Sequence, residues 1–243
     1  MYSIFKKEIS AFFSSLIAYI VVAVFLVMTG LFMWVFTDTS ILYYNYASLD
    51  QLFALAPMIF LFLIPAITMR AFAEENQKGT IEFLATKPVS DTDIVLGKYF
   101  ANLLLVLFAI LPTLLYYYSV YQLGSPVGNL DSGGIMGSYI GLIFLAGAFV
   151  AIGMWTSSIT DNQIVAFILG SFFCFVVHWS FDFIAQLGIF AGAGDALIAK
   201  LGIAHHYDSV SRGVLDSRDV LYFLSVITIF ILATLTSLSK RKW

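Results

Sequence analysis

Long runs of apolar residues, separated by short charged segments, dominate the chain. Six runs reach the roughly 20 residues that a helix needs to cross a bilayer. They do not alternate as the strands of membrane barrels do, so helices are favoured. We therefore predict an all-α integral membrane protein with six transmembrane helices. The runs lie between Glu8 and Asp38, Asp50 and Arg70, Lys98 and Asp131, Asp131 and Asp161, Asp161 and Asp182, and Asp219 and Lys240.

The composition supports this class and argues against others. Of the 243 residues, 60% are hydrophobic and 11% are charged, whereas soluble domains have about a quarter charged residues. A net charge of −3 offers no basic surface for nucleic acid, so none is expected as a partner. Cys174 is the single cysteine, which excludes an internal disulfide, and His205, His206 and Asp208 lack metal-ligand spacing. No metal or cofactor is predicted.

Basic residues are unequally divided between the two predicted sides of the membrane. One side carries both termini and the loop of residues 70–98, and the other carries only Lys200, Arg212 and Arg218. The positive-inside rule then places the termini and this loop in the cytoplasm. The basic residues of that side are Lys6, Lys7, Arg70, Lys78, Lys87, Lys98, Lys240, Arg241 and Lys242.

The first residues show an amphipathic pattern at helical spacing. Aromatic and aliphatic side chains gather on one face, opposite Lys7 and several serines. We predict an interfacial helix over residues 1–14 that lies flat on the cytoplasmic leaflet, with its lysines toward anionic headgroups. A simple extension of the first span is the alternative. The candidate membrane-contacting residues are Phe5, Lys6, Lys7, Ile9 and Phe12.

The loop of residues 70–98 concentrates charge and also contains apolar residues. A helical pattern breaks at Gly79, resumes over Thr80–Thr86 and stops at Pro88. Ser90, three residues before Asp93, is an expected N-cap of the third span. A solvated linker is one interpretation. The apolar side chains favour docking on a protein groove.

The motifs of this loop resemble the cytoplasmic loop of ABC-2 type permeases. They are an arginine that ends the second span, a Glu-Glu pair, Gly-Thr-x-Glu-x-Leu, Lys-Pro-Val-Ser and Ile-Val-Leu-Gly-Lys. In that family the loop contains a coupling helix that sits in a cleft of the ATPase subunit. The resemblance therefore implies ATPase coupling through Glu74, Glu75, Gly79, Thr80, Glu82, Leu84, Lys87 and Pro88.

Longer stretches resemble the ABC permease subunits associated with bacterial gliding motility. These stretches are residues 4–15, 55–70, 111–118, 121–131, 160–167 and 209–223. The resemblance implies a type V exporter-like domain in the bacterial cytoplasmic (inner) membrane. It also implies two copies of a separate ATPase subunit and a second permease-like subunit as heterodimer partner, although the residues leave a homodimer open.

Several features of the membrane body carry further expectations. Gly133, Gly137 and Gly141 recur every four residues in the fourth span and permit close helix approach, within the chain or to a partner permease. Pro65 and Pro112 are expected to kink the second and third spans.

The segment around the end of the fifth span carries three more expectations. Residues 183–194 are charge-free, too short to span and rich in glycine, which predicts a re-entrant or interfacial hairpin within an outer region of residues 182–219. His178 and Asp182, four residues apart, are expected to pair. Thr160 or Asp161 is the expected N-cap of the span.

No catalytic signature is present in the sequence. Gly97-Lys98 comes closest to a P-loop, but Thr92 and Tyr99 replace the required glycine and hydroxyl ligand. ATP with magnesium is therefore expected on the partner subunit. We predict a non-enzymatic permease subunit of an exporter, and the alternative is a membrane anchor that recruits an ATPase without transporting cargo.

Overall fold

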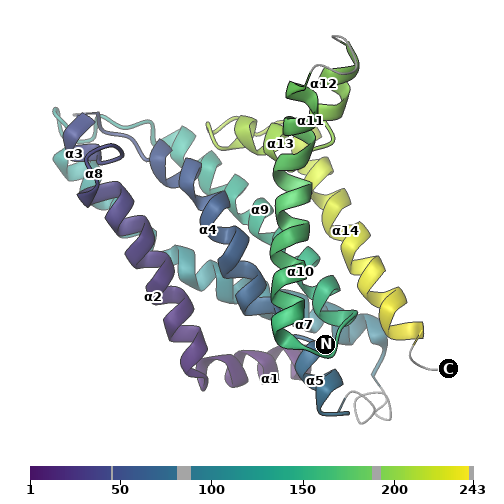
Figure 1. The fold of residues 1–243 in the computed structure, drawn as a ribbon. Helices are drawn as coiled ribbons and strands as arrows, with labels where there is room; N and C mark the ends of the chain where they lie inside the picture. Colours follow the sequence, from purple (N-terminus) through teal and green to yellow (C-terminus); the bar gives the residue numbers. More distant parts are fainter. Residues whose placement is uncertain (45, 81–88, 188–192, 241–243) are drawn as a thin grey trace.

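The computed structural model describes residues 1–44, 46–80, 89–187 and 193–240 (Figure 1). Within these ranges every regular element is helical. Six helices are long and apolar enough to cross a membrane, and they coincide with the six predicted runs, which confirms the predicted fold class. They are Ala18–Val35, Asp50–Gln77, Asp91–Leu123, Ser132–Ser158, Gln163–Gln186 and Ser217–Ser239.

Several spans consist of more than one helical element. The first joins α2 to the π-helical turn η1, the third joins α7 and α8 through the 3-10 turn η2, and the fifth joins α10 and α11 through the π-helical turn η3. The elements are α1 (Tyr2–Phe13), α2 (Leu16–Gly30), η1 (Leu31–Val35), α3 (Ile41–Tyr44), α4 (Asp50–Thr68), α5 (Ala73–Gln77), α7 (Asp91–Ile110), η2 (Leu111–Thr113), α8 (Leu114–Leu123), α9 (Ser132–Ser158), α10 (Gln163–Phe175), η3 (Val176–Ser180), α11 (Phe181–Gln186), α12 (Ala193–Ala199), α13 (Ile203–Val210) and α14 (Ser217–Ser239).

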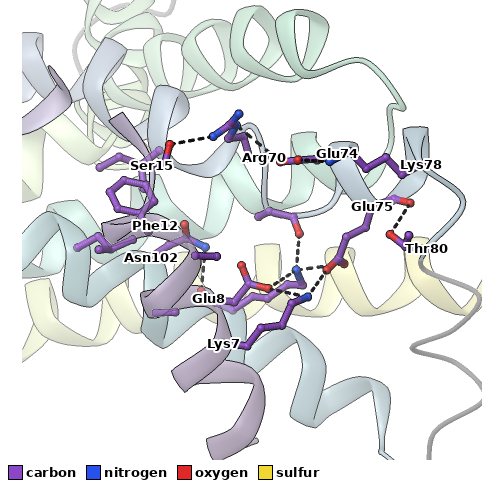
Figure 2. A pocket seen from close by; sticks show the side chains of 16 residues that line it. Lys7, Glu8, Phe12, Ser15, Arg70, Glu74, Glu75, Lys78, Thr80 and Asn102 are labelled. Atoms are coloured by element: carbon purple, nitrogen blue, oxygen red, sulfur yellow. Dashed lines mark hydrogen bonds and ion pairs between the residues drawn. The ribbon is translucent and has the colours of Figure 1, made fainter. Parts of the chain in front are cut away.

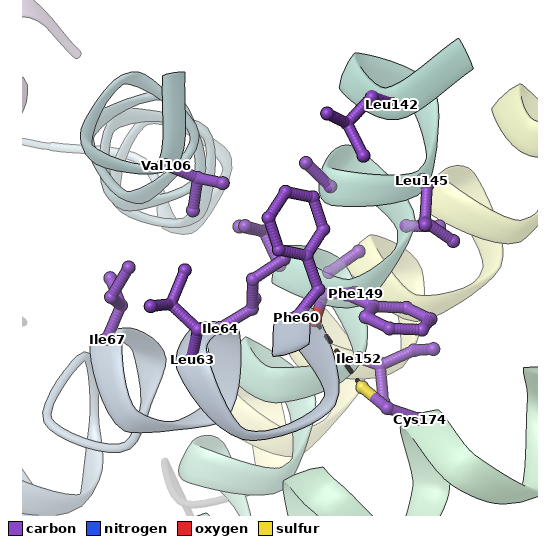
Figure 3. Packing of buried hydrophobic residues seen from close by; sticks show 14 of the residues in the cluster. Phe60, Leu63, Ile64, Ile67, Val106, Leu142, Leu145, Phe149, Ile152 and Cys174 are labelled. Carbon is purple, nitrogen blue, oxygen red and sulfur yellow. Dashed lines mark hydrogen bonds between the residues drawn. The ribbon is translucent and has the colours of Figure 1, made fainter. Parts of the chain in front are cut away.

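Helix α9 forms the centre of the bundle. It packs against α4, α7, α10 and α14, and most of its C-terminal half is buried. Phe60 of α4 and Phe149 of α9 meet in this core, and the thiol of Cys174 lies 4.0 Å from the carbonyl oxygen of Phe149 (Figure 3). Many small residues in α9 allow its neighbours to approach closely.

The helices outside the membrane spans gather at the two ends of the bundle. The N-terminus, α1, α5 and the C-terminal end of α14 lie at one end, and α3, α11, α12 and α13 lie at the other (Figure 1). An even number of spans requires the termini to share an end. The first, fifth and sixth spans are mostly exposed, whereas the second, third and fourth are mostly buried. The peripheral spans therefore offer apolar surface to lipid or to a partner.

Helix α1 is an element separate from the first span. It ends at Phe13 and crosses the end of the bundle, whereas α2 rises along its side (Figure 1). Its most buried residue, Ile4, belongs to the face that packs on α7, with Glu8 and Phe12 partly buried along it. The predicted helix is thus present and is not an extension of α2. Much of its inner face contacts protein.

Two local predictions are wrong. The N-cap of α10 is Asn162, whose side chain accepts from the backbone N–H of Ile164, because the hydroxyl of Thr160 instead accepts from the N–H of Asn162. His178 does not pair with Asp182: both its ring nitrogens lack a hydrogen-bond partner among the described residues. His178 lies in the π-helical turn, and its ring instead packs against the rings of Phe149 and Tyr207.

The region after the fifth span differs from a simple hairpin. Helix α11 extends the span to Gln186, so residues 183–186 belong to the spanning helix rather than to a separate re-entrant element. Helix α12 packs against α11, and Gly188 and Gly192 lie outside the described residues. In α13, the hydroxyl of Tyr207 donates to the carbonyl of Phe53 at 2.8 Å, which attaches this region to α4.

The two prolines have different local settings. Pro112 lies in the 3-10 turn that separates α7 from α8, so the third span changes its helical geometry there, as its ring requires. Pro65 lies inside α4, where the hydroxyl of Thr68 donates to the carbonyl of Ile64 at 2.9 Å.

Candidate functional site

A cavity of about 450 Å³, lined in part by charged side chains, opens at the end of the bundle that holds α1 and α5 (Figure 2). Helix α1, the segment from the end of α4 through α5, and α7 supply its walls. These elements come from three separate parts of the sequence. The charged residues around the cavity are Lys7, Glu8, Arg70, Glu74, Glu75, Lys78 and Lys98.

Lys98 of α7 is the most buried charge of this cluster, with 1% of its surface exposed. Its ammonium nitrogen lies 2.9 Å from Glu8 Oε1 and 3.1 Å from Glu75 Oε2. It also donates to the carbonyl of Ala71 at 2.6 Å and lies over the ring of Phe72. A buried ammonium needs such compensation. Lys98 therefore ties α1, α5 and α7 together.

Lys7 forms the outer part of the same network. Its ammonium nitrogen lies 3.0 Å from Glu75 Oε1 and 3.7 Å from Glu8 Oε1. Partial burial by itself disfavours the charged ammonium, but the hydrogen bond and charge of Glu75, together with Glu8, outweigh it and raise the pKa of Lys7. Lys7 is therefore held charged against α5.

A second ionic group forms the opposite wall of the cavity. Glu74 lies 2.6 Å from Lys78 and 3.6 Å from Arg70. Arg70 also donates to Ser15 at 3.3 Å and to Gln163 at 3.4 Å. These contacts connect α5 to the junction of α1 with α2 and to the start of the fifth span.

A residue of the fourth span, Ser157, caps the start of α5. The hydroxyl oxygen of Ser157 accepts from the backbone N–H groups of Phe72 and Ala73, both at 3.0 Å, and donates to the carbonyl of Met69 at 2.9 Å. The free N–H groups of a helix start are normally capped by a residue nearby in sequence. Here the cap comes from α9, so α5 is anchored to the centre of the bundle.

The predicted coupling residues fall into two groups. Glu74 and Glu75 point into the cavity, and Thr80 lines it (Figure 2). Gly79 adopts φ +66°, a left-handed conformation that favours glycine, so the predicted break is confirmed. Ser90 caps α7 by accepting from the N–H of Asp93 at 3.2 Å, also as predicted. Glu82, Leu84, Lys87 and Pro88 lie outside the described residues.

The predicted membrane-contacting residues of α1 are also divided. Lys7 and Phe12 line the cavity, and Lys6 is exposed away from it. Phe5 and Ile9 are half-buried. Sequence reasoning missed Glu8, although a carboxylate beside the apolar face of a helix was a usable signal. It also missed Lys98 and Ser157, for which only tertiary contacts supply the role.

The glycines of α9 have different neighbours. A Cβ on Gly137 would lie 2.6 Å from the carbonyl oxygen of Gly213, and one on Gly141 would collide with Val210. A Cβ on Gly133 would meet only Asp131 of the same helix start, at 3.5 Å. Gly137 and Gly141 therefore allow the end of α13 and the segment after it to approach α9 within this chain.

The opposite end of the bundle holds another cavity, of about 460 Å³. His206 lies at its wall, with Nδ1 2.7 Å from Asp219 Oδ1 and Nε2 3.0 Å from the carbonyl oxygen of Lys200. Its ring also stacks on Tyr222. Lys200, Arg212 and Arg218 line this cavity together with three aspartates. The charged residues and histidines of the cavity are Lys200, His205, His206, Asp208, Arg212, Asp216, Arg218 and Asp219.

Comparison with known proteins identifies the family. The family model described as "ABC-2 family transporter protein" matches residues 37–192, which is more than half of the chain. No curated protein matched. The membrane domains of this family are non-catalytic transporter subunits that work with an ATPase subunit. With its six candidate spans, this multi-pass membrane chain belongs to the ABC-2 transporter family as a permease membrane domain.

Proposed function

We propose that this chain is the permease subunit of an exporter and that residues 70–98 form its ATPase-coupling loop. The observation that carries this proposal is the anchoring of α5 to three other helices, α1, α7 and α9. Glu75 connects it to α1 and α7 through Lys98, and Ser157 connects it to α9. A displacement of this loop would therefore move the third and fourth spans with it.

The turn between α9 and α10 adds a further connection. The side chain of Asn76 donates to the carbonyl of Thr160 at 3.1 Å, and Arg70 contacts Gln163. A displacement of the loop would therefore move the start of the fifth span as well. Nucleotide-dependent movement of an ATPase subunit would shift the equilibrium between two arrangements of these spans.

Within the loop, we assign different tasks to the two groups of residues. Gly79, Thr80, Glu82, Leu84, Lys87 and Pro88 would contact the ATPase. Glu74 and Glu75 would transmit its movement, since their carboxylates pair with cations of this chain. In this proposal the ATPase binds the residues from Gly79 to Pro88, and Glu74 and Glu75 connect that binding segment rigidly to the rest of the bundle.

The cellular role rests on the sequence resemblance to GldF, the permease subunit associated with gliding motility. On that basis the chain would lie in the cytoplasmic membrane of a gliding bacterium with cytoplasmic termini. It would pair with a second permease-like subunit, as a heterodimer or a homodimer, and with two ATPase copies. The exposed first, fifth and sixth spans leave room for such a partner.

Site-specific crosslinking tests the dock. In a Cys174→Ser background, Glu82→Cys should crosslink to the co-expressed ATPase subunit in native membranes. Val127→Cys, exposed in the segment between α8 and α9, is the matched control and should not. Equal crosslinking of both variants, or of neither, would contradict the assignment of this loop as the dock.

A second experiment separates export from anchoring. The partner ATPase is replaced by a variant that binds ATP without hydrolysing it. The distribution of proteins and lipids between the two sides of the membrane is then compared with that in cells that lack the permease. An exporter should fail with the inactive ATPase just as it does without the permease. If the inactive ATPase restores the normal distribution and motility, the chain acts as an anchor.

A further inference from the structure

A third cavity lies in the elbow between α1 and α2 and is closed by α7. It measures about 230 Å³, and apolar and aromatic side chains supply nearly all of its surface. The rings of Phe13 and Phe108 meet edge to face in its wall, with their centroids 5.2 Å apart. The hydroxyl of Tyr19 donates to the carbonyl of Phe13 at 3.1 Å, which stabilises the elbow.

This apolar cavity adjoins the ionic cavity described above. Phe12 and Leu105 line both cavities, so one side-chain layer separates them. The pair of cavities lies where the first span begins at Ala18 and the second approaches its end. At this depth a bilayer changes from acyl chains to headgroups. A polar compartment is therefore joined to an apolar one at the headgroup boundary.

The ionic cavity has one positive charge in excess. Four cations, Lys7, Arg70, Lys78 and Lys98, face three carboxylates, Glu8, Glu74 and Glu75. Lys7 and Lys98 are matched by Glu8 and Glu75, whereas Arg70 and Lys78 share Glu74. The excess charge therefore lies beside Arg70. The contacts of its guanidinium with Ser15, Gln163 and Glu74 are all 3.3 Å or longer, so its donors retain capacity for a stronger acceptor.

We propose that the elbow binds one anionic glycerophospholipid, with its phosphodiester beside Arg70 and an acyl chain in the apolar cavity. A phosphodiester carries the single negative charge that the ionic cavity lacks. The planar guanidinium matches the geometry of phosphate oxygens. The ligand is a structural lipid that fixes the angle between α1 and α2, and its binding does not depend on the ATPase.

Native mass spectrometry of the full-length protein, exchanged into nanodiscs of defined lipid, tests this site. The wild type should retain one phosphatidylglycerol in preference to phosphatidylethanolamine. Arg70→Gln should reduce the retention of phosphatidylglycerol by about tenfold, because an ionic hydrogen bond is lost. Lys240→Gln, which removes an exposed charge outside the cavity, should leave it unchanged.

A second pair of variants tests the acyl-chain compartment without touching the ionic cluster. Ala23→Phe fills the apolar cavity and should abolish retention of either lipid, whereas Val24→Phe, at an exposed neighbour outside it, should not. Normal retention by Ala23→Phe would overturn the proposal. Competition by soluble glycerol phosphate as strong as that by phosphatidylglycerol would also overturn it, since the site would then recognise a free phosphate ester.

Discussion

The side chains of Lys98 and Glu75 form an ion pair of 3.1 Å across the base of the loop that joins the second and third spans. Glu75 lies in α5 near the beginning of the loop, and Lys98 lies in α7 at its end. The pair therefore joins the two stems of the loop. Glu8 adds α1 to the same junction. Several predictions of structure and coupling depend on this network.

Removal of the buried ammonium should destabilise the protein more than removal of an exposed one. Lys98→Met removes the buried one of the two ammonium groups that pair with Glu8 and Glu75, so we expect a loss of about 3–5 kcal/mol. Lys78→Met, which breaks an exposed pair with Glu74, should cost less than about 0.5 kcal/mol. Thermal unfolding in detergent compares them. Similar melting temperatures for the two variants would refute a structural role for Lys98.

A double variant refines this test. Lys98→Met combined with Glu75→Gln removes both an ion and its buried partner, so part of the lost stability should return. Additive losses would indicate that the two residues act independently.

Loss of the hydroxyl of Ser157 should release α5 from α9. Ser157→Ala leaves the N–H groups of Phe72 and Ala73 without their acceptor, at a cost of about 1–3 kcal/mol for each buried group. Hydrogen exchange should accelerate in residues 72–78. Ser225→Ala, which removes a local bond on an exposed part of α14, should not change exchange in α5.

The glycines of α9 should respond differently to a methyl group. Gly141→Ala forces the new Cβ against Val210, which should cost about 1–3 kcal/mol. Gly133→Ala meets only Asp131 at ordinary contact distance and should be neutral or stabilising by up to about 1 kcal/mol, because alanine favours helix. Melting temperatures of both variants in the same detergent test this. Equal tolerance would exclude close packing at Gly141.

The contacts of His206 predict a role in joining α13 to α14. Its ring nitrogens lie 2.7 Å from Asp219 Oδ1 and 3.0 Å from the carbonyl oxygen of Lys200. Each such hydrogen bond contributes about 0.5–1.5 kcal/mol, so His206→Ala should loosen this end of the bundle. Hydrogen exchange in residues 200–219 should accelerate in His206→Ala. His205→Ala, at an exposed neighbour, should leave it unchanged.

The sequence by itself determined the class of the protein and the positions of its spans. Apolar runs of this length have only one favourable arrangement in a bilayer, since helices satisfy their backbone hydrogen bonds internally. Local signals also predicted the break at Gly79 and the cap at Ser90 correctly, because these features depend on neighbouring residues.

The tertiary structure alone decided which residues form the sites. Ser157 and Ala73 are 84 residues apart, and Lys98 and Glu8 are 90 residues apart, so no local spacing relates them. The failed pairing of His178 with Asp182 has the same cause, because the ring of His178 packs against Phe149 and Tyr207, which are distant in the sequence. Helix periodicity predicts which residues can share a face, but the packing of distant helices decides which charges are buried together and need one another.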